Sequence, residues 1–125
     1  NKDRQCGDQM SRLKSNMLVS AALRYAATEF IDCVLVRRGD NDAGAIFLHI
    51  DGLDGRHKLL ARSLDFDGNY SWRSIVSEDE SDWVDAEAVE RRLAREIDLD
   101  PDVFVVEVND ANARNPFLLM SADEA

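Results

Sequence analysis

Apolar residues recur every three or four positions between residues 11 and 30, which is the spacing of one face of an α-helix. At about 100° per residue, these positions fall within an arc of roughly 140°. Ser11 is placed to cap the first turn. The apolar set is Val19, Ala22, Leu23, Ala26, Ala27 and Phe30. We therefore predict a helix over residues 11–30, whose alanines allow close packing against the sheet that follows.

Four apolar runs follow this helix, and short segments rich in Asp, Gly and Asn separate them. Gly and Asn accept positive φ angles and Asp bonds its own backbone, so these segments are typical of tight turns. Connections this short cannot hold a crossover helix, and we therefore predict a four-stranded antiparallel meander. The runs are residues 33–37, 45–50, 58–64 and 70–76, and the turns are residues 40–44, 51–55 and 65–69.

A second helical pattern follows an acidic segment over residues 78–82, whose charge suits the positive end of a helix dipole. Asp85 or Ser81 could cap this helix, and Pro101 ends it because proline disfavours helical geometry in the residue before it. A β-branched run over residues 103–108 predicts a last strand. The apolar stripe of the helix consists of Ala86, Val89, Leu93 and Ile97. The predicted fold class is α+β: an N-terminal helix, a four-stranded antiparallel meander, a second helix and a C-terminal strand.

The pattern indicates a single domain over residues 10–110. Residues 1–9 have no apolar period and are interpreted as an extension or a remnant of expression. Residues 111–125 are interpreted as a loosely ordered tail, in which residues 117–120 form an apolar patch for docking. The last strand could pair within the sheet or with a second copy of the chain, so a homodimer stays among the alternatives.

Charge narrows the classes of partner. The 125 residues include 25 Asp and Glu against 15 Lys and Arg, a formal net charge of -10, so the overall field repels nucleic acid and anionic membranes. No apolar run approaches the roughly 20 residues of a membrane-spanning helix, and the first ten residues contain no signal-peptide core. Cys6 and Cys33 form neither a metal motif nor a disulfide framework, so the reduced cytoplasm is the expected location.

Several ordered strings suggest a family. The clearest is Val-Arg-Arg-Gly-Asp-Asn-Asp-Ala-Gly-Ala over residues 36–45, and further strings lie at residues 10–14, 22–24, 53–55 and 97–108. Over about residues 10–110 the chain thereby resembles an alphaproteobacterial family, the domain of unknown function DUF1491. It departs from the family pattern by the additional Leu99 and Asp100 before the last strand. The resemblance implies a small intracellular bacterial protein and supplies no activity.

The turn aspartates are a candidate divalent-cation site. In a four-stranded meander the first and third turns emerge at the same end, roughly 10 Å apart. Four carboxylates gathered there would suit a hard cation, which takes oxygen ligands. The alternative is that aspartate simply favours turns. The four residues are Asp40, Asp42, Asp65 and Asp67.

A mixed face of the sheet is a second candidate site. Strand alternation groups Val34, Val36, Ile46, Leu48, Ile50, Leu59 and Ala61 under the first helix. The opposite face combines basic and aromatic side chains, which can contact phosphates and stack on bases. The alternative is that the second helix covers this face and pairs its charges. The candidate binding residues are Arg37, His49, Lys58, Arg62 and Trp72, with Phe47, Leu60 and Tyr70 beside them.

A Cys–His pair is the third candidate. His49 and His57 are the two histidines, and alternation places Cys33 and His49 on the same mixed face of neighbouring strands. The alternative is a core cysteine and a surface histidine. The chain contains no glycine-rich phosphate loop, Gly-x-Ser-x-Gly, His-Glu-x-x-His or Cys-x-x-Cys motif.

The sequence as a whole favours a non-enzymatic binding or regulatory module whose partner is a protein or a small ligand, with no bound cofactor. Its candidate contacts are the mixed face and the patch at residues 117–120. The alternative is a small metal-dependent or Cys/His enzyme, which would need the turn aspartates, or Cys33 and His49, to converge.

Overall fold

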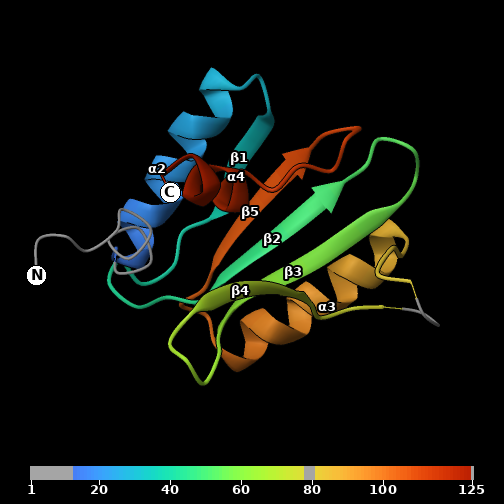
Figure 1. The fold of residues 1–125 in the computed structure, drawn as a ribbon. Helices are drawn as coiled ribbons and strands as arrows, with labels where there is room; N and C mark the ends of the chain where they lie inside the picture. Colours follow the sequence, from blue (N-terminus) through green and yellow to red (C-terminus); the bar gives the residue numbers. More distant parts are fainter. Residues whose placement is uncertain (1–12, 78–80, 125) are drawn as a thin grey trace, which may run out of the picture.

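The computed structural model describes residues 13–77 and 81–124, in which three helices cover the two faces of a five-stranded sheet (Figure 1). The elements are, in chain order, α2 (Ser15–Thr28), β1 (Asp32–Arg37), β2 (Ile46–Asp51), β3 (His57–Leu64), β4 (Tyr70–Ser74), α3 (Ala86–Leu99), β5 (Phe104–Asn109) and α4 (Pro116–Glu124). The α+β class is confirmed. The extension at residues 1–9 and the proposed cap Ser11 lie outside the described residues.

The sheet order is β1-β5-β2-β3-β4, which corrects the predicted meander. The antiparallel hairpins β2–β3 and β3–β4 are confirmed. However, β1 does not pair with β2, because β5 lies between them, antiparallel to β1 and parallel to β2. The last strand thus pairs within the chain. Burial explains the order: most residues of β5 are buried on both faces, which suits a central strand, whereas β1 alternates exposed and half-buried residues as an edge strand does.

The segment at residues 40–44 is therefore a loop that passes the start of β5 instead of a hairpin turn. The backbone N–H of Asp40 donates to the carbonyl oxygen of Asp102 at 3.0 Å, and the N–H of Phe104 donates to that of Ala45 at 2.7 Å. A Cβ atom at Gly39 or Gly44 would lie 2.5 or 2.6 Å from the Asp102 oxygen. Glycine is thus needed at both positions for the close approach of two backbones.

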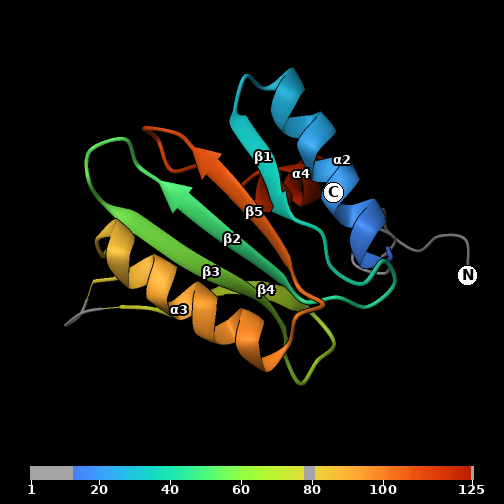
Figure 2. The same ribbon diagram turned by 180° about the vertical axis from the view of Figure 1, so that it is seen from behind.

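The helices divide the core into two layers. α2 and α4 cover one face, where Leu18, Val19, Ala22 and Ala26 of α2 pack with Ile46, Leu48, Ile50, Phe104, Val106, Val108, Phe117 and Met120. α3 covers the other face on the β3 side of the sheet, away from β1 (Figure 2). There Val89, with Leu93 and Ile97 beside it, packs on Phe47, Leu59 and Val105. Asp85 is the cap of α3, because its Oδ1 accepts the N–H of Ala88 at 2.9 Å.

The predicted composition of the two faces is partly wrong. Ile46, Leu48 and Ile50 face α2 as predicted, but the β2–β3 register pairs Leu59 with His49 and Ala61 with Phe47, so Leu59 and Ala61 face α3. Val34 and Val36 are on an uncovered part of the sheet and remain 46% and 57% exposed. The cause is a one-residue error in the assumed pairing, which moves a whole strand to the opposite face.

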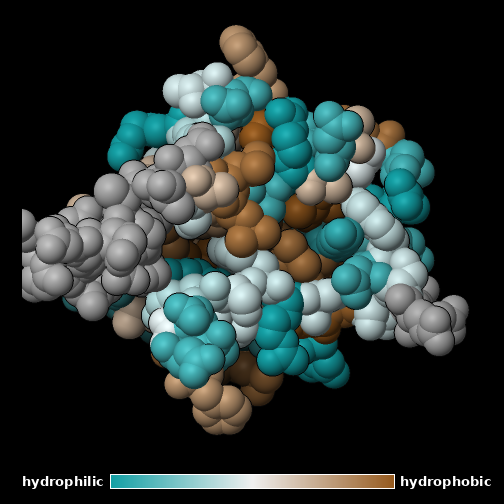
Figure 3. Space-filling model, viewed as in Figure 1, coloured by the Kyte–Doolittle hydropathy of each residue, from teal (hydrophilic) through white to brown (hydrophobic). Residues whose placement is uncertain are grey.

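The last segment is a helix and not the loosely ordered tail that the sequence suggested. Phe117 and Met120 of α4 are buried in the core, while Leu118 and Leu119 remain exposed. The side-chain oxygen of Asn115 caps the helix by accepting the N–H of Phe117 at 2.9 Å. Half of the predicted docking patch is thus core, and apolar atoms reach the surface around α4 (Figure 3).

Among the described residues, no helix has both the length and the apolar character that crossing a membrane requires.

Candidate functional site

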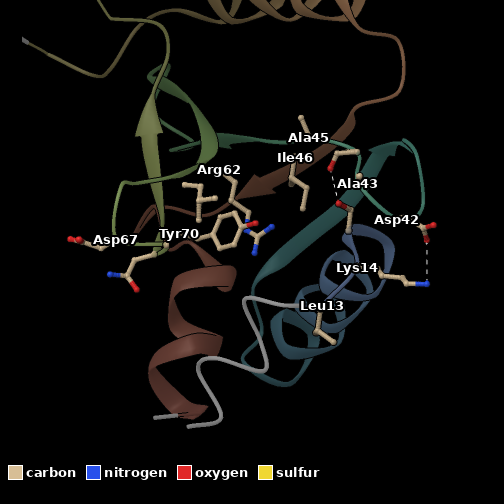
Figure 4. Close-up of a pocket in the computed structure, with 14 residues that line it drawn as sticks. Leu13, Lys14, Asp42, Ala43, Ala45, Ile46, Arg62, Asp67 and Tyr70 are labelled. Carbon is tan, nitrogen blue, oxygen red and sulfur yellow. Dashed lines mark hydrogen bonds and ion pairs between the residues drawn. The ribbon is translucent and has the colours of Figure 1, made fainter. Parts of the chain in front are cut away.

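A cleft of about 770 Å³ opens at the end of the sheet where β2 begins and β3 ends (Figure 4). Three segments that are distant in sequence form its walls: the start of α2, the loop before β2, and the β3–β4 hairpin. The lining residues are Leu13, Lys14, Ser15, Asp42, Ala43, Gly44, Ala45, Ile46, Arg62, Leu64, Asp67, Gly68, Asn69 and Tyr70.

The first wall is fixed by hydrogen bonds between α2 and the loop before β2. The buried hydroxyl of Ser15 donates to the carbonyl oxygen of Gly44 at 2.7 Å. The N–H of Ser15 donates to the carbonyl oxygen of Asp42 at 3.3 Å, and that of Asn16 to the carbonyl oxygen of Asn41 at 2.9 Å. Carbonyl oxygens of the loop therefore accept hydrogen bonds from two N–H groups that would otherwise be unpaired at the start of the helix.

The opposite wall is the β3–β4 turn, which Asp65 organises. Its Oδ1 accepts the N–H groups of Asp67 and Asn69, both at 2.9 Å. Gly68 has a φ of +86°, which residues with a side chain rarely adopt. The turn thereby holds Tyr70, the first residue of β4, in the lining of the cleft.

Arg62 and Tyr70 lie toward the middle of the cleft (Figure 4). They come from neighbouring strands, and the guanidinium carbon of Arg62 lies 3.6 Å from the centroid of the Tyr70 ring, a cation–π contact. Burial lowers the pKa of Arg62, although the nearby Tyr70 opposes this shift. The guanidinium nevertheless stays charged at neutral pH, because the ordinary pKa of arginine is so high.

The remaining charges line the rim. Lys14 Nζ lies 3.6 Å from Asp42 Oδ1, and both side chains are mostly exposed, so their interaction is weak. Asp67 lies on the opposite wall, where Figure 4 shows its carboxylate pointing away from the middle.

The four turn aspartates do not form the predicted cation site. The turns at residues 40–44 and 65–69 do lie at the same end, since Asp42 and Asp67 line one cleft. Within residues 13–77 and 81–124, however, no three or more His, Cys, Asp or Glu side chains are close enough together to hold a metal ion. Local bonds explain this: Asp40 accepts the N–H of Ala43, Asp65 organises its own turn, and Asp42 pairs with Lys14.

The predicted basic face is divided between the two sides of the sheet. Arg37 pairs with Val105 on the α3 side, where its Nη2 donates to the carbonyl oxygen of Pro101 at 2.8 Å. His49 is on the same side. Arg62 and Trp72 pair with each other on the opposite side, where Trp72 packs on Phe117 with ring centroids 4.8 Å apart. Of the five predicted binding residues, Arg62 is the one that lines the cleft.

Lys58, the remaining member of that set, contacts an aromatic ring outside the cleft. Its Nζ lies 4.6 Å from the centroid of the Trp83 ring, and Arg56 is at the same distance from that ring. Both cations therefore surround Trp83 in the segment before α3.

Cys33 and His49 lie on opposite faces of the sheet, so the predicted Cys–His pair is wrong. Cys33 pairs with Val108 and packs toward α2, whereas His49 pairs with Leu59 on the α3 side. Burial, together with Asp32, raises the pKa of the Cys33 thiol to about 11. This thiol is therefore protonated at neutral pH and is a poor nucleophile.

The two histidines instead contact each other, which the sequence analysis missed. His49 Nε2 and His57 Nδ1 are 2.9 Å apart, and His57 Nε2 lies 4.0 Å from Asp51 Oδ1. Burial lowers the pKa of His49; Glu107, Asp51 and Glu90 oppose this shift, and His57 adds to it. The feature that could have revealed this contact is the β2–β3 register, which pairs Asp51 with His57 and thus places His57 diagonally from His49.

Comparison with known proteins identifies the family. The sequence model described as "Protein of unknown function (DUF1491)" matches residues 13–118. None of the curated proteins compared with the chain matches it. The chain is similar to the crystal structure of a DUF1491 family protein from Caulobacter crescentus, with 26% identity, a TM-score of 0.73, and coverage of 84% of this chain and 94% of that one.

Two solution structures are also similar. An NMR structure of a DUF1491 family protein from Caulobacter crescentus has 25% identity and a TM-score of 0.71 over 84% of this chain and 92% of that one. Protein Atu0922 from A. tumefaciens has 27% identity and a TM-score of 0.66 over 78% and 86%. Because the family match extends from the first described residue to α4, the chain belongs to the DUF1491 family.

Proposed function

We propose that this protein is a non-enzymatic binding module that takes up a small ligand in the cleft between α2, the loop before β2 and the β3–β4 hairpin. The observation that carries the proposal is the cleft itself, whose volume of about 770 Å³ lies in the range of small-molecule sites. Hydrogen bonds within each wall hold it in place, which supports a preformed binding space.

The chemistry of the lining favours binding over catalysis. The residues that line the cleft in the described part of the chain include no histidine or cysteine, and the hydroxyl of Ser15 is engaged with Gly44. The alternative, a metal-dependent or Cys/His enzyme, lacks its required groupings among the described residues, because the turn aspartates do not gather and Cys33 and His49 face opposite sides. A cytoplasmic location stays an expectation from cysteine usage.

A screen of small polar compounds by two-dimensional NMR tests the proposal. Compounds that bind should shift the backbone amide signals of Gly44, Gly68 and Asn69, which line the cleft from both sides. Filling the space with Ala43→Trp should abolish these shifts, because Ala43 lines the cleft and is exposed. The matched control is Ala27→Trp, at an exposed alanine near the end of α2. The proposal fails if no compound shifts the cleft amides, or if both variants bind equally well.

A further inference from the structure

We propose that β1 is an interaction surface through which two copies of this chain form a two-fold symmetric dimer. The β1 strands of the two copies would pair antiparallel and join their sheets into one. The inference goes beyond the proposed function, because none of residues 32–37 lines the cleft.

The outer edge of β1 is the first argument. β1 lies at one end of the five-stranded sheet, with β5 on its inner side. In the described part of the chain, the backbone–backbone hydrogen bonds of β1 run to β5. Because the backbone groups of a strand point alternately to its two sides, about half of the N–H and C=O groups of β1 point outward. Such a row of groups is a template for pairing with another strand.

The second argument is the difference between the two edges of the sheet. β4, the opposite edge, exposes Ser71 and the charged Arg73, and charged side chains on an edge prevent sheets from associating. Between Asp32 and Arg37, β1 has the apolar sequence Cys-Val-Leu-Val. The register shift near Arg37 also protects an edge, but it leaves residues 32–35 in regular pairing. Most of β1 therefore lacks the devices that keep an edge single.

The third argument identifies the occupant as a second copy. If the two-fold axis passes beside Val34, this residue lies opposite Val34 of the partner subunit, and Cys33 lies opposite Leu35 of the partner subunit. Asp32 then lies opposite residues 36–37 of the other strand, because the register shift sets both of those residues against one residue of a neighbouring strand. The carboxylate of Asp32 therefore meets the charge of the partner's Arg37, once at each end of the interface.

The two charges lie on the same face, as this contact requires. Asp32 pairs with Asn109 and Arg37 with Val105 of β5, and residues four positions apart on a strand point to the same side. The hydrogen bond from Arg37 to the carbonyl oxygen of Pro101 leaves the positive charge in place. A strand of another protein would need the matching charges, whereas β1 supplies both members of the pair.

The apolar side chains add to the backbone pairing. Val34 is 46% exposed, on a part of the sheet that α3 does not cover. Side chains opposite each other in an antiparallel pair lie roughly 5 Å apart, so the two copies of Val34 would remove part of this surface from water. An interface between two strands of six residues is small, and we therefore expect a dimer that dissociates on dilution.

Sedimentation equilibrium of the full chain tests the proposal at concentrations up to about 1 mM, where weak association is still measurable. The mass should rise with concentration from the 14.1 kDa of one chain toward twice that value. Val34→Lys should weaken the association at least about tenfold, because two lysines would face each other at the axis. Ser71→Lys is the matched control: it adds the same charge at an exposed position of the opposite edge and should dimerise like the wild type.

Substitutions of Asp32 test the charge pairing. Asp32→Asn removes the attraction to the partner's Arg37, whereas Asp32→Arg adds a repulsion, so the dimer should weaken progressively from wild type to Asn to Arg. Asp32 is exposed, so both variants should fold. If Val34→Lys does not fold, the comparison of these two variants decides the matter.

Cross-linking tests the register. In a chain with Cys6→Ser and Cys33→Ala, Val34→Cys should form an intermolecular disulfide under mild oxidation, because the two copies of residue 34 face each other within disulfide reach. Val36→Cys is the matched control, at a second exposed valine of β1. Its two copies lie away from the axis, so it should cross-link at least about tenfold more slowly.

Three results would overturn the proposal. The first is a mass of one chain at every concentration. The second is a dimer that Val34→Lys and Asp32→Arg leave intact, or that Ser71→Lys weakens as much as they do. The third is faster cross-linking at residue 36 than at residue 34, since the charges would then not meet. The ligand screen at the cleft is independent of all three, so the binding module can stand or fall by itself.

Discussion

The two ends of the β2–β3 hairpin place their polar side chains in different surroundings. The far end is the tight turn between β2 and β3, and the near end is the open end, where β2 begins and β3 ends. At the far end, His49 and His57 are directed at each other at 2.9 Å on the α3 side, with Asp51 close to His57. At the near end, on the other side of the sheet, Arg62 and Tyr70 lie in a cleft of about 770 Å³. The histidines are the more conspicuous group chemically, yet they are occupied with each other. Open volume beside a charged group, more than a cluster of titratable residues, therefore marks the candidate site.

The largest expected effect comes from Gly44→Ala, which tests how rigid the near end is. A Cβ atom there would lie 2.6 Å from the backbone oxygen of Asp102 and 2.8 Å from backbone atoms of Asp40. Backbone must move to relieve these contacts, so we expect the free energy of unfolding to fall by about 1–3 kcal/mol. Urea denaturation measures it, with Ala43→Ser, at the exposed neighbouring residue, as control. A variant as stable as the wild type would show that the loop is not held against β5.

A smaller loss is expected from Ser15→Ala, which removes the hydrogen bond from α2 to the carbonyl oxygen of Gly44. The bond is buried, so its removal should lower the free energy of unfolding by about 1 kcal/mol. Ser20→Ala on the exposed face of α2 is the control, and should be neutral or slightly stabilising because alanine favours helix. Equal melting temperatures for the two variants would argue against a fixed first wall.

We expect the stability of the fold to depend on pH because of His49 at the far end. The pKa of His49 is lowered in the fold below its ordinary value of 6.5, chiefly by burial. The unfolded chain therefore takes up a proton at His49 more readily, and the free energy of unfolding falls as the pH drops below about 6.5, until the folded group also titrates. His49→Gln should lose less stability than the wild type between pH 7 and 5, as measured by thermal unfolding. Parallel pH profiles would show that His49 does not contribute.

The smallest expected effect concerns divalent cations at the near end. Because Asp40 and Asp65 bond their own turns and Asp42 pairs with Lys14, we expect calcium, magnesium or manganese to leave the melting temperature unchanged. If a cation raised the melting temperature and Asp42→Asn removed that effect, the cation hypothesis would regain its support.

Local sequence signals predicted the elements better than their arrangement. The helices α2 and α3, the hairpins β2–β3 and β3–β4 and the cap Asp85 follow from periodicity and turn chemistry. The segment at residues 40–44 has the same turn chemistry, but its path depends on β5, which is about 60 residues away in the chain. The continuous apolar run at residues 103–106 was the available sign of a central strand, because it leaves no face for water.

The site was less accessible to such reasoning. Arg62 was among the predicted binding residues and it lines the cleft, but it had been assigned to a face that the register divides. The cleft arises only when three distant segments meet, so no short motif encodes it. The helix α4 had an overlooked signal: Asn115 at the cap and Pro116 in the first turn are typical of a helix start.

The place of β5 between β1 and β2 has a consequence for the order of folding. As the ribosome releases the chain, β2, β3 and β4 can associate early, since each pairs with a sequence neighbour. β1 must wait for residues 104–109, because its backbone pairs with β5. Until then the outer edge of β2 is unpaired and open to other nascent chains. Completion of the sheet, and with it of the loop that walls the cleft, therefore depends on a strand that is made about 60 residues after the loop itself.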